Sequence, residues 1–153
     1  MPVRKLKEFL DNEGVKYVTI SHSKAYTAQE VAASAHISGK EMAKTVMVKL
    51  DGKMAMVVLP ANHKVDFELI EKDLGVKNAE LASEDEFRGL FPECEVGAMP
   101  PFGNLYDMAV YIEEDLTQGN RIAFNAGSHT EVIRVPYDDF ERLVKPKVFK
   151  AAK

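Results

Sequence analysis

The sequence predicts an α+β fold in which helices flank a single mixed, largely antiparallel β-sheet. Two apolar runs, 44–50 and 54–59, flank Asp51-Gly52-Lys53, a strong signal for a β-hairpin. Segments with helical spacing are interspersed with such strands, but without the regular strand–helix alternation of parallel α/β proteins. No internal repeat or linker divides the chain, so we expect residues 1–153 to form one domain.

The helices are predicted from hydrophobic spacing and from their end signals. Leu6, Phe9 and Leu10 share one face of a helix over 3–13, and Gly14 follows as its stop. The other expected helices run from a capping box at Thr27 with Glu30 to about Ala35, over 64–74, from a second capping box at Ser83 with Glu86, and from Pro136 onward.

The strands outside the hairpin are expected to be short. They show apolar alternation or β-branched residues and are bounded by glycine, proline or polar turn residues. The expected strands are 17–20, one within 106–116, and the pair 121–125 and 130–135, which is joined around Gly127.

Composition limits the possible functions. The single cysteine permits no intramolecular disulfide and no CxxC metal motif, and a reducing cytoplasm fits it best. No run of about 18 uncharged apolar residues could span a membrane. The net charge of −4 argues against a general nucleic-acid or DNA binder, but it allows contact with the end of a nucleic acid.

Lys44 opens the first strand of the predicted hairpin and is the first candidate for chemistry. Alternation places it on the same face as Val46, Val48 and Leu50, which we expect to point inward. Burial of an ammonium group costs free energy unless the charge is paired or used. The alternative is that Lys44 lies at a strand end and extends its amine to solvent.

Two other segments could surround Lys44. The loop GAMPPFGN (97–104) carries glycines that let the backbone approach a substrate, so that its N–H groups could bind a negatively charged oxygen. Its prolines, Pro100 and Pro101, lack N–H groups and would stiffen it. The second segment is the polar turn FNAGSHTEV (124–132).

Together these segments resemble the YbaK/prolyl-tRNA synthetase-associated domain family of aminoacyl-tRNA deacylases. The match is carried by AKTVMVK (43–49), VGAMPPFGN (96–104) and FNAGSHTEVIRV (124–135), and the order of elements agrees along nearly the whole chain. Lys44 matches the family's lysine, and Gly97 through Pro101 match its G-x-x-x-P loop. The resemblance implies a trans-editing hydrolase without metal or cofactor, which deacylates mischarged tRNA at its acceptor end and has an aminoacyl-tRNA synthetase as a further partner.

The resemblance also implies roles for individual residues. Lys44 could hold the substrate through its charge or, with a lowered pKa, act as a base on water; the family favours positioning, assisted by a ribose hydroxyl of the substrate. The amides of Gly97, Ala98 and Met99 would stabilise the oxyanion. The expected substrate-binding residues are Pro101, Phe102, Gly103, Tyr26, Thr27, Asn125, Gly127 and His129. NAGSH stands where several branches of the family have a serine-led S-A-G-R-like stretch, which leaves the role of Asn125 open.

Simpler explanations stay open for these candidates. Met99, Phe102 and Tyr26 could be core residues rather than pocket walls, and Thr27 could serve only as a helix cap. The 97–104 loop could be merely a stiff connection, and 125–129 an ordinary turn.

Two other functional classes are also considered. One is a non-catalytic module that binds an aminoacylated or nucleotide end without cutting it. The other is a metal-dependent hydrolase, although the histidines show no ligand spacing. Its ligands would come from His22, His63 or His129 together with Asp66 or Asp107.

Overall fold

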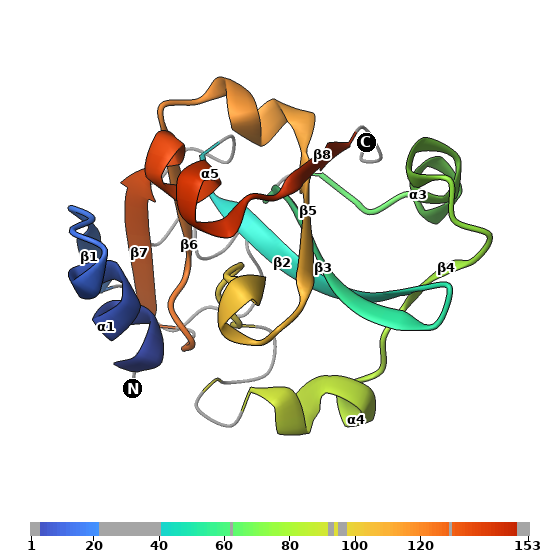
Figure 1. Ribbon diagram of the computed structural model, residues 1–153, viewed down its shortest axis with the longest axis horizontal. Helices are drawn as coiled ribbons and strands as arrows, with labels where there is room; N and C mark the ends of the chain where they lie inside the picture. The colour runs from blue at the N-terminus through green and yellow to red at the C-terminus, as the bar shows by residue number, and fades with distance from the viewer. Residues whose placement is uncertain are drawn as a thin grey trace.

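The computed structural model describes residues 4–21, 41–61, 63–91, 94, 98–128 and 130–149, and it shows an α+β fold (Figure 1). The described helices are α1 (Arg4–Asn12), α3 (Phe67–Leu74), α4 (Glu84–Phe87) and α5 (Tyr137–Val144), with 3₁₀ helices η1 (Arg88–Leu90), η2 (Gly103–Leu105) and η3 (Glu114–Gln118). The described strands are β1 (Val18–Ser21), β2 (Ala43–Leu50), β3 (Lys53–Pro60), β4 (Ala79–Leu81), β5 (Ala109–Glu113), β6 (Arg121–Asn125), β7 (Glu131–Pro136) and β8 (Lys147–Phe149).

The strands form two sheets, where the sequence predicted one. An antiparallel sheet has the order β1-β7-β6, and a mixed sheet has the order β4-β2-β3-β5-β8, in which β5 is parallel to both of its neighbours. The sheets meet at one isolated parallel bridge between Met42 and Ala123. The two sheets are not joined further along β2, because β2 pairs with β3 over its whole length from Ala43 to Leu50. The α+β class and the largely antiparallel pairing are confirmed.

The β2–β3 hairpin is confirmed, with a tighter turn than predicted. Asp51 and Gly52 have φ of 50° and 86°, so both central residues are left-handed, as in the two-residue turns that favour Asp-Gly. Lys53 already belongs to β3 and pairs with Leu50, and the ladder continues to Ala43 opposite Pro60. This register fixes Lys44 opposite Leu59.

Apolar clusters cover both faces of the mixed sheet. The larger cluster contains Met47 and Met56 together with an aromatic group in which the Phe102 ring lies 5.3 Å from Phe124 and 5.4 Å from Phe140. The smaller cluster lies on the α3 side. Its buried residues are Val48, Leu50, Ala55, Val57, Leu59, Ile70, Ala79 and Phe149.

Several predicted helix ends are observed directly. Asp66 caps α3 by accepting a hydrogen bond from the Leu69 amide at 3.1 Å, so this helix begins later than the predicted residue 64. Gly75 ends it in a left-handed conformation. The Ser83–Glu86 capping box is confirmed, since each residue's amide donates to the other's side chain. The helix predicted from Thr27 lies outside the described residues.

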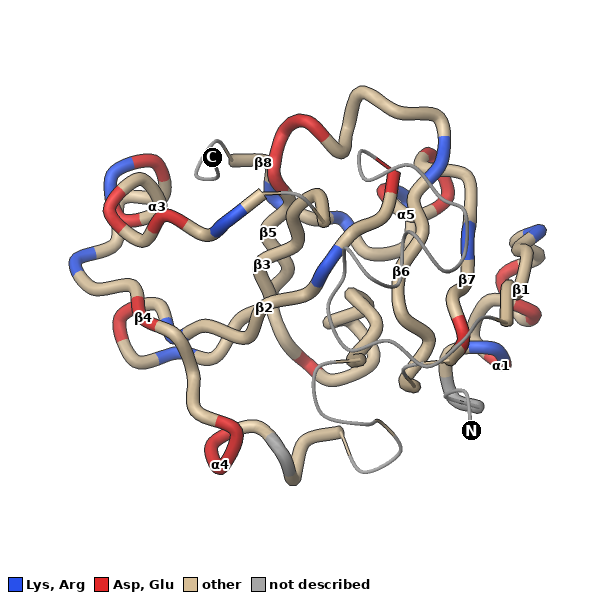
Figure 2. Tube along the Cα trace, turned by 180° about the vertical axis from the view of Figure 1, so that it is seen from behind, with Lys and Arg blue, Asp and Glu red and all other residues tan. Residues whose placement is uncertain are grey.

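Charge is dispersed over the described part of the molecule. Lys and Arg are interspersed with Asp and Glu along the chain, while α4 carries only acidic charges (Figure 2). The two charged residues of η3 are also acidic. Among the described helices, none combines the length and the apolar character that crossing a membrane requires.

Candidate functional site

The three segments singled out in the sequence approach one another at the start of β2. The Met42–Ala123 bridge brings this end of β2 beside β6, and the Ala123 amide donates to the Glu41 carbonyl at 3.1 Å. Beyond β6, the Gly127 amide donates to the Ala98 carbonyl at 2.9 Å. Backbone contacts therefore connect β2 to β6, and the turn after β6 to the 98–103 loop.

Lys44 is half-buried and has no described carboxylate partner. Burial of its ammonium group lowers its pKa, and the nearby charge of Lys64 lowers the pKa further. Its neighbours across and along the sheet, Leu59 and Val48, belong to the smaller cluster. Lys44 therefore faces the α3 side, on the face of β2 that carries the buried Val48 and Leu50, as the alternation predicted.

The side chains of Asn125, at the end of β6, and Lys44, near the start of β2, lie on the same side of the two sheets. Each lies two residues past the bridge, and residues two apart on a strand share a face. Asn125 is 8% exposed, and its Oδ1 atom is buried with no hydrogen-bond partner among the described residues. Gly127 follows with φ of 92°, a conformation that favours glycine.

The described part of the loop, Ala98 to Gly103, is buried throughout. Among the described residues, the backbone amides of Ala98 and Met99 have no backbone acceptor. Phe102 is fully buried and its ring lies within the aromatic core, so its side chain is a core residue. Pro101 and Gly103 are buried beside it.

Met99 borders a surface pocket of about 250 Å³ on the other side of β2. Its other lining residues are Thr45, Val46, Met47, Leu81, Ala82, Glu84 and Phe87. This pocket could not be predicted from local sequence patterns, because its walls come from β2, β4, α4 and the 98–103 loop, which meet only through tertiary packing. Four expected site residues, Tyr26, Thr27, Gly97 and His129, lie outside the described residues.

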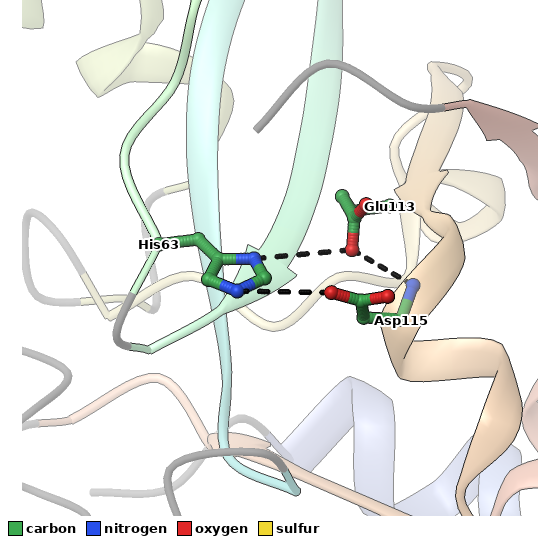
Figure 3. A group of neighbouring side chains, drawn as sticks. All are labelled: His63, Glu113 and Asp115. Carbon is green, nitrogen blue, oxygen red and sulfur yellow. Dashed lines mark hydrogen bonds and ion pairs between the residues drawn. The ribbon is translucent and has the colours of Figure 1, made fainter. Parts of the chain in front are cut away.

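Among the described residues, no group of three potential metal ligands combines His63 with Asp66 or Asp107, the carboxylates considered for a metal-dependent hydrolase. Asp66 caps α3, and Asp107 is exposed in a turn with φ of 55°. His63 instead lies near Glu113 and Asp115, which follow it by some fifty residues in sequence (Figure 3). Distant groups of this kind cannot be paired from spacing. His22 and His129 are outside the described part of the chain.

Sequence comparison gives a family match and relatives. The aminoacyl-tRNA editing domain family matches residues 22–143. A prolyl-tRNA editing protein ProX from Acetoanaerobium sticklandii is 25% identical over 93% of this chain and 91% of its own length. A proline–tRNA ligase from Bacillus cytotoxicus is 34% identical over 54% of this chain, and the match spans only 14% of that ligase.

Solved structures share the fold. A hypothetical protein matches with a TM-score of 0.85 at 20% identity, over 98% of this chain and 100% of its own. A protein described as a candidate trans-editing enzyme for prolyl tRNA synthetase matches with a TM-score of 0.82 at 19% identity, over 98% of this chain and 96% of its own. At these identities the likeness concerns the fold.

Proposed function

The chain belongs to the aminoacyl-tRNA editing domain family, and we propose that it is a trans-editing deacylase that cuts the ester between a wrong amino acid and the 3′ end of a tRNA. One observation carries the site assignment: Lys44 is a half-buried cation that no described carboxylate neutralises. Family membership favours this enzyme over a non-catalytic binding module.

Ester hydrolysis develops negative charge on the carbonyl oxygen, and this charge must be stabilised as water attacks. The amides of Ala98 and Met99 are suited to this task because they have no described backbone acceptor and belong to a loop stiffened by Pro100 and Pro101. Loss of one such donor typically costs about 3–4 kcal/mol of transition-state stabilisation. We assign Gly97 to the same group because it completes the family's loop motif.

Lys44 is proposed to hold the substrate through its positive charge. Its ammonium group lies at the strand end beside β6, where a carbonyl oxygen or the terminal phosphate can approach it. A second lysine, Lys64, adds positive charge nearby. The pair would attract an anionic substrate end while leaving the rest of the surface acidic on balance.

Asn125 is proposed to bind the substrate's α-ammonium group or a ribose hydroxyl. A buried carbonyl oxygen without a donor costs roughly 1–3 kcal/mol, so a bound donor would recover that free energy. Gly127 keeps this turn in place through its hydrogen bond to Ala98. His129, Tyr26 and Thr27 stay proposed contacts on the strength of the family resemblance.

The names of the relatives support a specific substrate. ProX is named as a prolyl-tRNA editing protein, and the ligase relatives charge tRNA with proline. We therefore propose a tRNA mischarged by prolyl-tRNA synthetase as the substrate, and that synthetase as the partner.

The direct test is deacylation of mischarged tRNA by purified protein in the presence of a chelator. Lys44→Ala should slow single-turnover hydrolysis roughly 10²–10³-fold, the usual effect of losing one preorganised electrostatic group. Lys53→Ala is the matched control, because Lys53 is an exposed lysine at the far end of the same hairpin.

Wild-type turnover in Lys44→Ala would refute the role assigned to this lysine. Absence of hydrolysis by the wild-type protein, across a panel of amino acids on the tRNAs for proline, alanine and threonine, would refute the deacylase proposal itself. Release from one tRNA alone would define the specificity.

A further inference from the structure

Three potential metal ligands meet on the side of the mixed sheet where β3 ends and β5 passes into η3. His63 lies three residues past β3, Glu113 is the last residue of β5, and Asp115 lies in η3. The His63 Nδ1 atom is 3.9 Å from Glu113 Oε2, and His63 Nε2 is 3.7 Å from Asp115 Oδ2 (Figure 3). One ligand atom from each residue lies within 4.8 Å of the others.

The protein groups present do not fully compensate for burial of the Glu113 carboxylate. Glu113 is 5% exposed, and its Oε2 atom accepts a hydrogen bond from the Asp115 amide at 2.8 Å. Within the described residues, His63 is its only potential cationic partner, at a distance too long for a hydrogen bond. His63 Nδ1 is itself buried and has no hydrogen-bond partner in that part of the chain.

The donor set and its spacing suit a divalent transition-metal ion. One imidazole nitrogen and two carboxylate oxygens are a combination that zinc accepts, with remaining positions left to water. Ligands about 2.0–2.2 Å from a tetrahedral ion lie roughly 3.3–3.6 Å from one another. The 3.9 and 3.7 Å distances start from different ring nitrogens of His63, and one ion takes a single nitrogen. With one ligand atom from each residue, the three atoms lie within 4.8 Å of one another, so coordination requires a contraction of up to about 1.5 Å. Asp115 can supply it, because its side chain is 67% exposed and free to change rotamer.

We propose that His63, Glu113 and Asp115 bind a divalent transition-metal ion, with Zn²⁺ as the reference ion. The ion would join the segment after β3 to the β5–η3 junction. Pro60, at the end of β3, pairs with Ala43, which precedes Lys44. The metal would thus stabilise the strand end that carries the candidate site without entering the hydrolytic reaction.

The test uses the full chain without an affinity tag, freed of metal with a chelator and then dialysed. Calorimetric titration with Zn²⁺ should show a site that binds one ion per chain. At an excess of 100 times Kd, Zn²⁺ should raise Tm by roughly 5–10 °C. No tRNA is present, so the result is independent of the deacylase proposal.

Asp115→Asn is the most informative variant, because this exposed side chain can be changed with little risk to folding. It should weaken Zn²⁺ binding by at least about tenfold, since loss of even an outer-shell partner commonly has that effect. Asp138→Asn, an exposed acid in α5 with the same change of charge, should bind Zn²⁺ like the wild type.

His63→Gln tests for the imidazole ligand. Titration with Co²⁺ should give the visible absorption of a low-symmetry site in the wild-type protein, and this absorption should be lost in His63→Gln. The proposal is overturned if the wild type binds no Zn²⁺, or if both variants bind it with the affinity of Asp138→Asn. Equal far-UV circular dichroism of the metal-free proteins confirms that all variants are folded.

Discussion

At the residue scale, Lys44 and Lys49 show how one strand can hold two lysines with different roles. The Lys49 ammonium group lies 2.7 Å from Glu86 and 3.7 Å from Glu80, and its pKa is raised, chiefly by the hydrogen bond to Glu86. Lys44 has no such partner among the described residues, and burial lowers its pKa. Because the two lysines are five residues apart, they point to opposite faces of β2. Lys49 is paired within the fold, whereas the charge of Lys44 is available to a ligand.

This difference leads to a prediction about pH dependence. If protonated Lys44 positions the substrate, single-turnover deacylation should decrease at alkaline pH as the ammonium group loses its proton. The decrease should begin at a lower pH than for an ordinary lysine, because the folded-state pKa is lowered. Lys64→Gln removes a repelling positive charge, so it should raise the pKa of Lys44 and shift the decrease to higher pH. The measurement is a rate–pH profile corrected for spontaneous ester hydrolysis.

The control for this profile is Lys53→Gln, which removes an exposed lysine at the other end of the hairpin and should leave the profile unchanged. A rate that rises through the same alkaline range would instead identify Lys44 as a base on water. If Lys64→Gln does not shift the decrease in rate at alkaline pH, a group other than Lys44 controls that decrease.

At the element scale, local signals in the sequence predicted the hairpin and the helix ends well. Asp51-Gly52 specifies a tight turn, and Ser83 with Glu86 forms the expected capping box. The short strands β4 and β8 were missed, because three residues are too few to establish an alternating pattern. They form only because longer neighbouring strands offer free backbone groups for pairing.

Substitution of Gly103 tests how closely the 98–103 loop packs against the start of β5. A Cβ atom at this position would collide with the Met108 carbonyl oxygen and would lie 2.6 Å from Val110 Cγ2. Gly103→Ala should therefore lower the free energy of unfolding by about 1–3 kcal/mol, as expected for an overpacked site. Urea-induced unfolding measures this change.

Gly89→Ala is the matched control, since a Cβ atom on Gly89 in η1 would meet nothing within 4 Å. It should leave the free energy of unfolding unchanged or raise it slightly. A Gly103→Ala protein within about 0.5 kcal/mol of the wild type would contradict the close approach of the loop to β5.

At the scale of the whole molecule, alternation in the sequence placed Lys44 on the correct face of β2, with Val48 and Leu50, but it could not show which elements cover that face. The mixed sheet has apolar clusters on both faces, so β2 lacks a clean alternation of buried and exposed residues. The register of Lys44 with Leu59 shows that this face packs against the smaller cluster on the α3 side. The His63–Glu113–Asp115 cluster was likewise hidden, because its members meet through tertiary packing alone.

The charge of the whole chain leads to the last prediction, which concerns tRNA binding. A chain of net charge −4, with its basic residues dispersed among acidic ones, should contact few phosphates (Figure 2). Contact with one to three phosphates of a single-stranded 3′ end should give a slope of log binding constant against log salt concentration of roughly −0.7 to −2. Fluorescence anisotropy with a non-hydrolysable aminoacyl-tRNA analogue, at several KCl concentrations, measures this slope. Lys44→Gln should make the slope shallower by about 0.7, the contribution of one phosphate contact. Lys53→Gln should not change the slope. A Kd that does not vary with salt would exclude a phosphate-bearing end as the ligand held at Lys44, because release of counterions accompanies every such contact.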